Sequence, residues 1–175
     1  MANILIVYSS TDGHTLKICQ VLKQTIERGS HDVKLASITE EPDGALGLFD
    51  KIVVGASIRY GKHRPQVYEF IKRNQKLLES IPSAFFTVNV VARKPLKNTP
   101  QTNPYLKKFL EKSAWQPKEL GVFAGKLDYQ KYKFWDRQVI RLIMKLTQGP
   151  TDPNSVTEFT NWLEVEKFGQ RISVM

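Results

Sequence analysis

Hydrophobic residues along this chain form short continuous runs that alternate with stretches of helical spacing. The runs predict five strands buried on both faces, at Asn3–Tyr8, Asp32–Ala36, Lys51–Ala56, Ser83–Val90 and Leu120–Ala124. Apolar positions three or four residues apart predict helices at about Thr15–Arg28, Gln66–Glu79, Thr102–Lys112 and Asn154–Phe168. This alternation favours an α/β fold with a doubly wound parallel sheet, and a length of 175 residues suits one domain spanning residues 1–175.

The loop after the first strand is rich in hydroxyl groups and leads directly into a helix. It contains Ser10, Thr11, Asp12, Gly13, His14 and Thr15. Unpaired amides and the positive end of the helix dipole favour an anion at such a position. The loop has neither the Gly-Lys-Ser/Thr ending of a nucleoside triphosphate site nor the GxGxxG of a dinucleotide site. A small monophosphate therefore fits best, and an ordinary capped helix is the alternative.

Three positions of this loop, Ser10, Gly13 and Thr15, match the loop that binds the FMN phosphate in flavodoxins, which the segment resembles. The match fails at Asp12, where flavodoxins have a hydroxyl residue. Because a carboxylate repels a phosphate dianion, we expect Asp12 to turn away and accept hydrogen bonds from backbone amides.

Two more loops follow the third and fourth strands, at the edge of the sheet where open α/β folds bind ligands. The first contains Ser57, Ile58, Arg59, Tyr60 and Gly61, and the second contains Asn89, Val90, Val91, Ala92 and Arg93. Small residues admit a flat ring, Tyr60 can stack on it, and backbone and Asn89 amides can meet its polar edge. Together the three loops predict FMN as cofactor. A phosphorelay receiver domain is disfavoured because Ala56 and Ser57 stand where it needs an aspartate.

The segment of about residues 126–150, which we call the insert, has no counterpart in a minimal flavodoxin. It starts with an aromatic stretch that includes Tyr132 and is followed by a helix predicted from about Asp136 to Thr147. One helix face is apolar: Trp135, Val139, Leu142, Ile143 and Leu146. Another face is basic: Arg137, Arg141 and Lys145. This pattern indicates a helix on an anionic membrane surface, although packing on the chain's own body or on a second subunit stays open.

Positive charge is concentrated in two segments. Residues 93–118 carry a net +6 and residues 126–150 a net +4, against +9 for the whole chain, so the rest is close to neutral. One basic face that meets an anionic partner is the simplest interpretation. Lone Cys19 excludes an internal disulfide, and no signal peptide or membrane-spanning run is evident, so we expect a cytosolic protein or one attached to a cytosolic surface. We expect no metal site.

Four blocks and the insert resemble the flavodoxin-like, quinone-dependent protoporphyrinogen oxidases of bacterial haem synthesis. The blocks are residues 55–61, 83–85, 91–95 and 99–103, and the insert contributes residues 132–137 and 142–145. The resemblance covers nearly the whole chain. It implies an FMN enzyme that oxidises protoporphyrinogen IX and passes electrons to a membrane quinone, usually menaquinone. It also implies a peripheral location on the cytoplasmic side of the inner membrane.

Candidate residues for the substrate lie in the two loops that follow the third and fourth strands, which we call the ring-side loops. Arg59, Arg93 and Lys94 are candidates for contacts with propionates or flavin, with plain surface charge as the alternative. Tyr132, Trp135, Arg137, Arg141 and Lys145 are candidates for the membrane and quinone side. His63 is interpreted as a solvated loop histidine and His14 as contributing mainly its backbone amide. We name no catalytic acid or base, because flavin chemistry requires placement rather than a protein nucleophile.

Other functions explain less of the sequence. A flavodoxin electron carrier or another FMN quinone reductase would share the FMN site, but carriers are typically acidic and lack the insert. A nucleic-acid-binding module could use the basic face with Tyr129, Tyr132 and Trp135 as stacking platforms, but it leaves all three loops unexplained. We therefore expect no nucleic-acid partner, and a homo-oligomer stays open.

Overall fold

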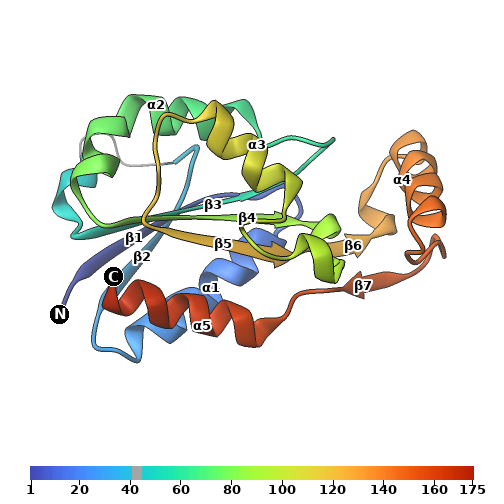
Figure 1. Cartoon of the computed structure of the whole chain (residues 1–175). Coiled ribbons are helices and arrows are strands. Elements are labelled where there is room, and N and C mark those ends of the chain that lie inside the picture. Colours follow the sequence, from blue (N-terminus) through green and yellow to red (C-terminus); the bar gives the residue numbers. More distant parts are fainter. Residues whose placement is uncertain (41–44) are drawn as a thin grey trace.

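The computed structural model describes residues 1–40 and 45–175. Its central sheet has five parallel strands in the order β2-β1-β3-β4-β5 (Figure 1). They are β1 (Asn3–Ser9), β2 (Asp32–Ser37), β3 (Lys51–Ser57), β4 (Ser83–Asn89) and β5 (Glu119–Ala124). The helices α1 (His14–Glu27) and α5 (Trp162–Val174) cover one face, and α2 (Pro65–Ser80) and α3 (Pro104–Lys112) cover the other. The predicted doubly wound α/β architecture is confirmed.

Alternation along each strand divides the core into two layers, because successive side chains point to opposite faces. Leu5 and Val7 of β1 face α2 and α3, whereas Ile4 and Ile6 face α1 and α5. Gly55 in β3 lets the Phe86 ring cross that strand, since a Cβ atom there would lie 2.2 Å from the ring. The two layers explain why the strands appear in the sequence as continuous apolar runs.

The insert extends beyond its predicted end near residue 150, to residue 160, and adds a small second sheet and a projecting helix. Strand β6 (Lys126–Asp128) pairs antiparallel with β7 (Val156–Glu158), and α4 (Phe134–Leu146) lies between them in sequence. In Figure 1, α4 stands away from the sheet, beyond the carboxyl ends of the strands. The buried hydroxyl of Tyr129 donates to the carbonyl of Pro150 over 2.6 Å and closes the base of the insert. Short 3-10 turns complete the description at Leu46–Leu48, Val90–Arg93, Pro95–Lys97 and Tyr129–Lys131.

The predicted start of the last helix at Asn154 is wrong. Residues 156–158 form β7, and α5 begins only after Asn161, whose side chain accepts from the amide of Glu164. Val156 and Leu163, two of the apolar residues whose spacing predicts that helix, are 50% and 58% exposed. The buried positions are instead Val165, Phe168, Gly169 and Ile172. Pairing with β6 takes precedence over the apparent helical spacing across these residues.

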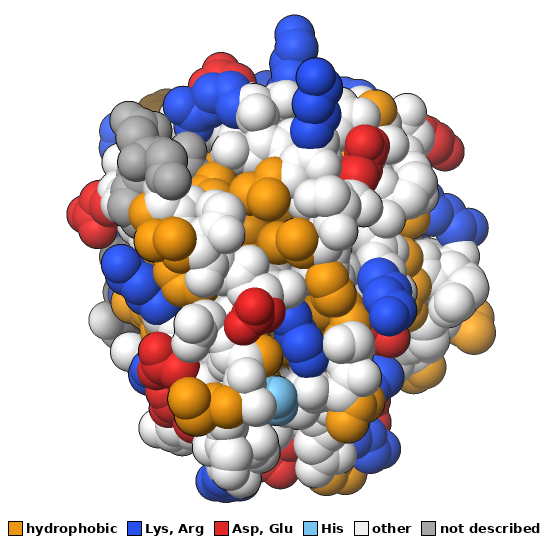
Figure 2. All heavy atoms as spheres, turned by 90° about the vertical axis from the view of Figure 1, so that its left-hand side faces the viewer, with side chains coloured by type: hydrophobic (Ala, Val, Ile, Leu, Met, Phe, Trp, Pro, Cys, Tyr) orange, Lys and Arg blue, Asp and Glu red, His pale blue; other side chains and the backbone are white. Residues whose placement is uncertain are grey.

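The end of the molecule opposite to α4 carries side chains of both charge signs on its surface. Figure 2 looks onto the side from which the strands start, where basic and acidic side chains are scattered around a central apolar area. Among the described helices, none is long and apolar enough to cross a membrane.

The interpretation of His63 as a solvated loop residue is also wrong. Its side chain is 3% exposed, its Nε2 lies 3.0 Å from the Thr87 hydroxyl, and its ring packs against Phe85 and Phe109. Burial lowers the pKa of His63 from 6.5 to about 4. The imidazole is therefore neutral at pH 7 and belongs to the core below α2.

We predict that this buried histidine makes the fold acid-sensitive. Because its pKa is lower in the folded chain, the unfolded chain binds more protons between pH 6.5 and 4, and stability falls as the pH falls through that window. Protonation of this histidine lowers the free energy of unfolding by about 2 kcal/mol between pH 7.5 and pH 5. Urea unfolding at both pH values should show this loss in the wild type and a smaller loss in His63→Gln, whose amide does not titrate. Equal losses in the two proteins would contradict the prediction.

Candidate functional site

A cavity of about 80 Å³ lies at the carboxyl ends of β1, β3 and β4. We call it the loop cavity. The loop of residues 10–15 between β1 and α1, which we call the phosphate-type loop, lines one side. The ends of β3 and β4 line another. The insert closes the remaining side with Lys126, Asp128, Lys131 and Tyr132. Parallel strands bring these loops together at the predicted edge of the sheet.

The phosphate-type loop presents unsatisfied donors. Gly13 has a φ of 84°, caps α1 without a side-chain hydrogen bond, and donates its amide to the Ser10 hydroxyl over 3.1 Å. The first turn of α1 contains no acidic residue. The hydroxyls of Ser9 and Thr11 are buried without a hydrogen-bond partner, and Thr11 lines the loop cavity. Because buried polar groups without partners are unfavourable, this loop is suited to an anionic acceptor such as a phosphate.

Asp12 lines the loop cavity, and the partner of its carboxylate differs from the one expected. Its carboxylate pairs with the Arg59 guanidinium at 3.0 Å, and not with backbone amides. The Arg59 guanidinium also lies over the rings of Tyr60 and Tyr132, at 5.2 Å and 4.9 Å. The ammonium of Lys131 donates to the Asp12 carbonyl over 2.9 Å. These contacts connect the phosphate-type loop, the loop after β3 and the insert.

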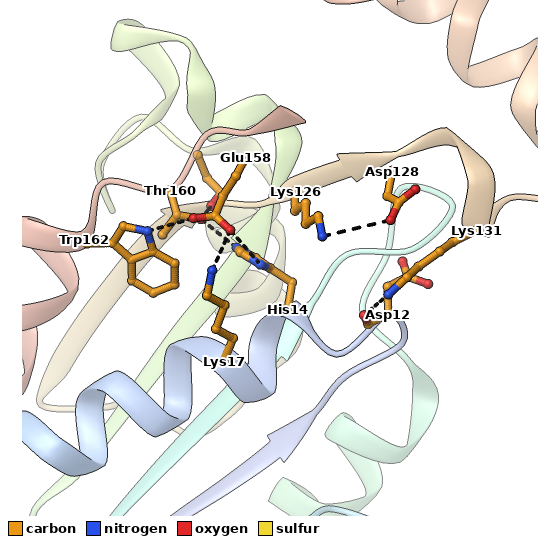
Figure 3. A network of polar contacts seen from close by, with 10 residues as sticks. Asp12, His14, Lys17, Lys126, Asp128, Lys131, Glu158, Thr160 and Trp162 are labelled. Atoms are coloured by element: carbon orange, nitrogen blue, oxygen red, sulfur yellow. Dashed lines mark hydrogen bonds and ion pairs between the residues drawn. The ribbon is translucent and has the colours of Figure 1, made fainter. Parts of the chain in front are cut away.

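A second polar network joins the start of α1 to β7 and α5 (Figure 3). The Thr160 hydroxyl donates to the Ala124 carbonyl, so Nε2 of His14 donates to Thr160 over 2.6 Å. Glu158 accepts from Lys17 and from the Trp162 indole, each over 2.8 Å. Burial, with smaller contributions from neighbouring lysines, lowers the pKa of His14, so its ring is neutral at pH 7. The imidazole thus has a structural role, while the His14 amide belongs to the phosphate-type loop.

Two lysines of the loop cavity were missed as candidate ligands by the sequence interpretation. Lys126 and Lys131 belong to the insert and line the cavity opposite the phosphate-type loop. In Figure 3 they lie beside Asp128 and Asp12, at 4.0 Å from the Asp128 carboxylate for Lys126. The only sequence signal was the net positive charge of residues 126–150, which did not indicate which residues turn inward.

A larger cavity of about 460 Å³ adjoins the loop cavity. We call it the apolar groove. Its floor comes from both ring-side loops, and its wall is the inner side of α4, with Val139, Ile140, Ile143 and Met144. Tyr60 and Gly61 have positive φ values of 50° and 74°, which turn the chain sharply between Arg59 and Lys62. The Tyr60 hydroxyl donates to Asp136 of α4 over 2.8 Å. The volume lies in the range of small-molecule sites.

The structure brings most predicted cofactor residues together, but not all of them. Residues lining one or both cavities are Ser10, Thr11, Asp12, His14, Thr15, Ser57, Ile58, Arg59, Tyr60, Gly61, Asn89, Val90 and Val91. Gly13, Ala92, Arg93 and the substrate candidate Lys94 line neither cavity. The Arg93 guanidinium instead donates to the Thr147 hydroxyl over 2.9 Å and holds the end of α4. The part of the chain that the structure describes contains no cluster of three metal-binding side chains.

The outer face of α4 leaves large apolar side chains in solvent. Trp135 is 78% exposed and Leu146 is 76% exposed, and Leu142, at 59%, lies between them. Lys145 lies beside this face, whereas Arg141 is held by a hydrogen bond to the Thr151 carbonyl over 2.9 Å. The predicted apolar face of α4 is therefore not buried against the rest of the protein. That face remains available to a partner.

Sequence comparison identifies the family. The family described as flavodoxin domain matches residues 5–154. Protoporphyrinogen IX dehydrogenase [quinone] of Escherichia coli K12 is 40% identical over 169 residues, which cover 97% of this chain and 93% of that protein. The Leishmania major protein of the same name is 39% identical over 98% of this chain and 74% of its own length.

Solved structures agree on the fold. A two-electron reduced flavodoxin of Megasphaera elsdenii superposes with a TM-score of 0.60 at 12% identity, covering 98% of this chain and 99% of that one. Flavodoxin 1 of Bacillus cereus gives 0.55 at 14% identity, covering 97% and 96%. The chain therefore belongs to the flavodoxin-domain family, and it is an oxidoreductase of the group that includes the quinone-dependent protoporphyrinogen IX dehydrogenases.

Proposed function

We propose that this protein binds FMN, oxidises protoporphyrinogen IX to protoporphyrin IX and passes the electrons to a membrane quinone such as menaquinone. The main support is 40% identity, over 97% of the chain, to a protein named protoporphyrinogen IX dehydrogenase [quinone], a match that includes the insert. The fit of the site to FMN, to a tetrapyrrole and to a membrane adds support from the residues themselves.

The loop cavity suits the phosphate of FMN. The orphaned Thr11 hydroxyl and the start of α1 provide donors, and Lys126 and Lys131 provide opposite charge. The two ring-side loops meet next to this cavity, since both contribute residues to it and to the adjoining apolar groove. Bound there, FMN supplies a two-electron acceptor, while the chain positions the reactants and excludes water.

The apolar groove suits a large, mostly hydrophobic substrate beside the flavin site. Its wall of α4 side chains and its floor of ring-side loops offer mainly apolar contacts, with Tyr60 and Asp136 linked at one edge. Two titratable side chains of the groove, Tyr60 and Asp136, are hydrogen-bonded to each other. We assign the chain the roles of binding and orienting the substrate.

The outer face of α4 suits the surface of an anionic bilayer. Trp135, Leu142 and Leu146 are exposed on one face, with Lys145 beside them. Burying such side chains in lipid is favourable by roughly 1.5–3 kcal/mol each, and a nearby lysine adds about 1 kcal/mol on an anionic surface. A helix lying in the interface would place the apolar groove, on its inner side, next to the membrane and its quinone.

The decisive test is anaerobic oxidation of protoporphyrinogen IX by FMN-loaded protein with a menaquinone analogue. Porphyrin fluorescence should grow only when quinone is present and should vanish when FMN is removed. Absence of porphyrin, although FMN is bound and reducible, would refute the substrate assignment and favour an electron carrier or another quinone reductase.

A second prediction concerns the insert lysines. Changing Lys126 and Lys131 together to Ala should raise the Kd for FMN at least about tenfold, because two charge-assisted contacts to the phosphate are lost. The Kd for riboflavin, which has no phosphate, should not change. Titration by flavin fluorescence quenching measures both. Lys133→Ala with Lys145→Ala, an exposed pair from the same insert, is the matched control, and an equal effect there would contradict the prediction.

A third prediction concerns the membrane face. Replacing Trp135, Leu142 and Leu146 together by Gln should weaken binding to anionic phospholipid vesicles at least about tenfold in a sedimentation assay. FMN binding should persist, since none of the three lines the loop cavity. Leu48, Leu96 and Leu163 are equally exposed elsewhere, and their triple replacement by Gln is the control. Unchanged vesicle binding by the α4 variant would refute the role of this face.

A further inference from the structure

A third cavity, of about 350 Å³, lies between α2 and α3. We call it the lysine cavity. It shares Ile58, Gly61 and Tyr105 with the apolar groove, so the two cavities adjoin across the turn that follows β3. Its floor is the buried side chain of His63. Nothing in the phosphate-type loop or the insert reaches it.

The lysine cavity carries uncompensated positive charge. Lys62, Lys108 and Lys112 line it, against one carboxylate, Glu69. In the described part of the chain none of these lysines makes an ion pair or a side-chain hydrogen bond, unlike Lys17 and Lys131 near the phosphate-type loop. His63 is neutral at pH 7 and adds no charge.

These lysines are placed by rigid elements. Lys108 and Lys112 lie four residues apart on α3 and therefore share one face of that helix. Lys62 is fixed by its backbone pairing with Arg59, with N–O distances of 2.9 Å and 3.2 Å. Three lysines therefore line one cavity, and that cavity adjoins the apolar groove.

The combination defines the chemistry of a ligand. A molecule with a broad apolar body and carboxylates along one edge would place the body in the apolar groove and the carboxylates among the lysines. Protoporphyrinogen has this form, because its two propionates are on neighbouring pyrroles and its other substituents are methyl and vinyl groups. The arginines expected from the sequence are already engaged, Arg59 with Asp12 and Arg93 with Thr147.

We propose that the lysine cavity is the subsite for the two propionates, with Lys62, Lys108 and Lys112 as specificity-determining residues. The proposal rests on the proposed function, since it assigns one part of that substrate to one part of the surface. It also fixes the orientation of the tetrapyrrole: the carboxylate edge lies toward α2 and α3, and the opposite, hydrocarbon edge lies toward α4 and the bilayer.

The test compares two triple variants of the FMN-loaded protein. Lys62→Ala/Lys108→Ala/Lys112→Ala removes the proposed contacts. Lys72→Ala/Lys76→Ala/Lys107→Ala removes the same charge from exposed positions on the same two helices that do not line the cavity. The cavity variant should raise the KM for protoporphyrinogen IX about tenfold with little change in kcat, and the control should stay within about threefold.

Equilibrium binding separates carboxylate recognition from general electrostatics. Protoporphyrin IX, the product, should bind the cavity variant about tenfold more weakly than the wild type by fluorescence titration. Its dimethyl ester, which has no free carboxylate, should bind both proteins alike. Equal weakening in the control variant, or equal weakening for the ester, would overturn the subsite.

The two levels of inference can fail separately. If the wild type oxidises protoporphyrinogen but the cavity variant retains its KM and its affinity for protoporphyrin IX, the propionate subsite is wrong and the proposed function stands. If the wild type neither oxidises protoporphyrinogen nor binds protoporphyrin IX although FMN is bound, the proposed function fails and the subsite fails with it.

Discussion

The three-residue ladder between β6 and β7 determines how the site is assembled. Pairing of Lys126 with Glu158 brings the two ends of the insert together at the carboxyl edge of the main sheet. One end then supplies Lys126 and Lys131 to the phosphate-type loop, and the other supplies Glu158 and Thr160 to the start of α1. Because α4 is held between these ends, its inner side forms the wall of the apolar groove. An unpaired insert would provide none of these contacts.

The sequence specified the sheet well and the insert poorly, for physical reasons. Strands such as Ile4–Val7 are buried on both faces, so their apolar runs depend only on local composition. The start of α5 depends instead on β7 pairing with a strand about thirty residues away, a contact that helical spacing cannot reveal. His63 was misjudged for the same reason, because its core partners Phe85, Thr87 and Phe109 come from β4 and α3.

The predicted site shows the same division. The loops that follow β1, β3 and β4 were located from the sequence because parallel strands end at one edge. The sequence did not reveal which basic side chains line the cavities, because each of them had several possible neighbours. Arg93 holds the end of α4, Arg59 pairs with Asp12, and lysines from the insert and from α3 line the cavities instead. Asp12, the position at which the loop departs from the flavodoxin pattern, is the partner of Arg59, so its charge is neutralised within the site.

Separate groups of lysines allow one end of the molecule to meet several anions without competition. Lys126 and Lys131 face the loop cavity, Lys62, Lys108 and Lys112 face the lysine cavity, and Lys145 lies on the outer side of α4. A phosphate, a pair of carboxylates and a lipid surface would each neutralise only their own group. The far end, with its mixture of both signs of charge, offers no comparable attraction (Figure 2). In the proposed function, this positive charge would bring the protein to the membrane with α4 and the adjoining cavities foremost, because electrostatic attraction orients a protein before its apolar contacts form.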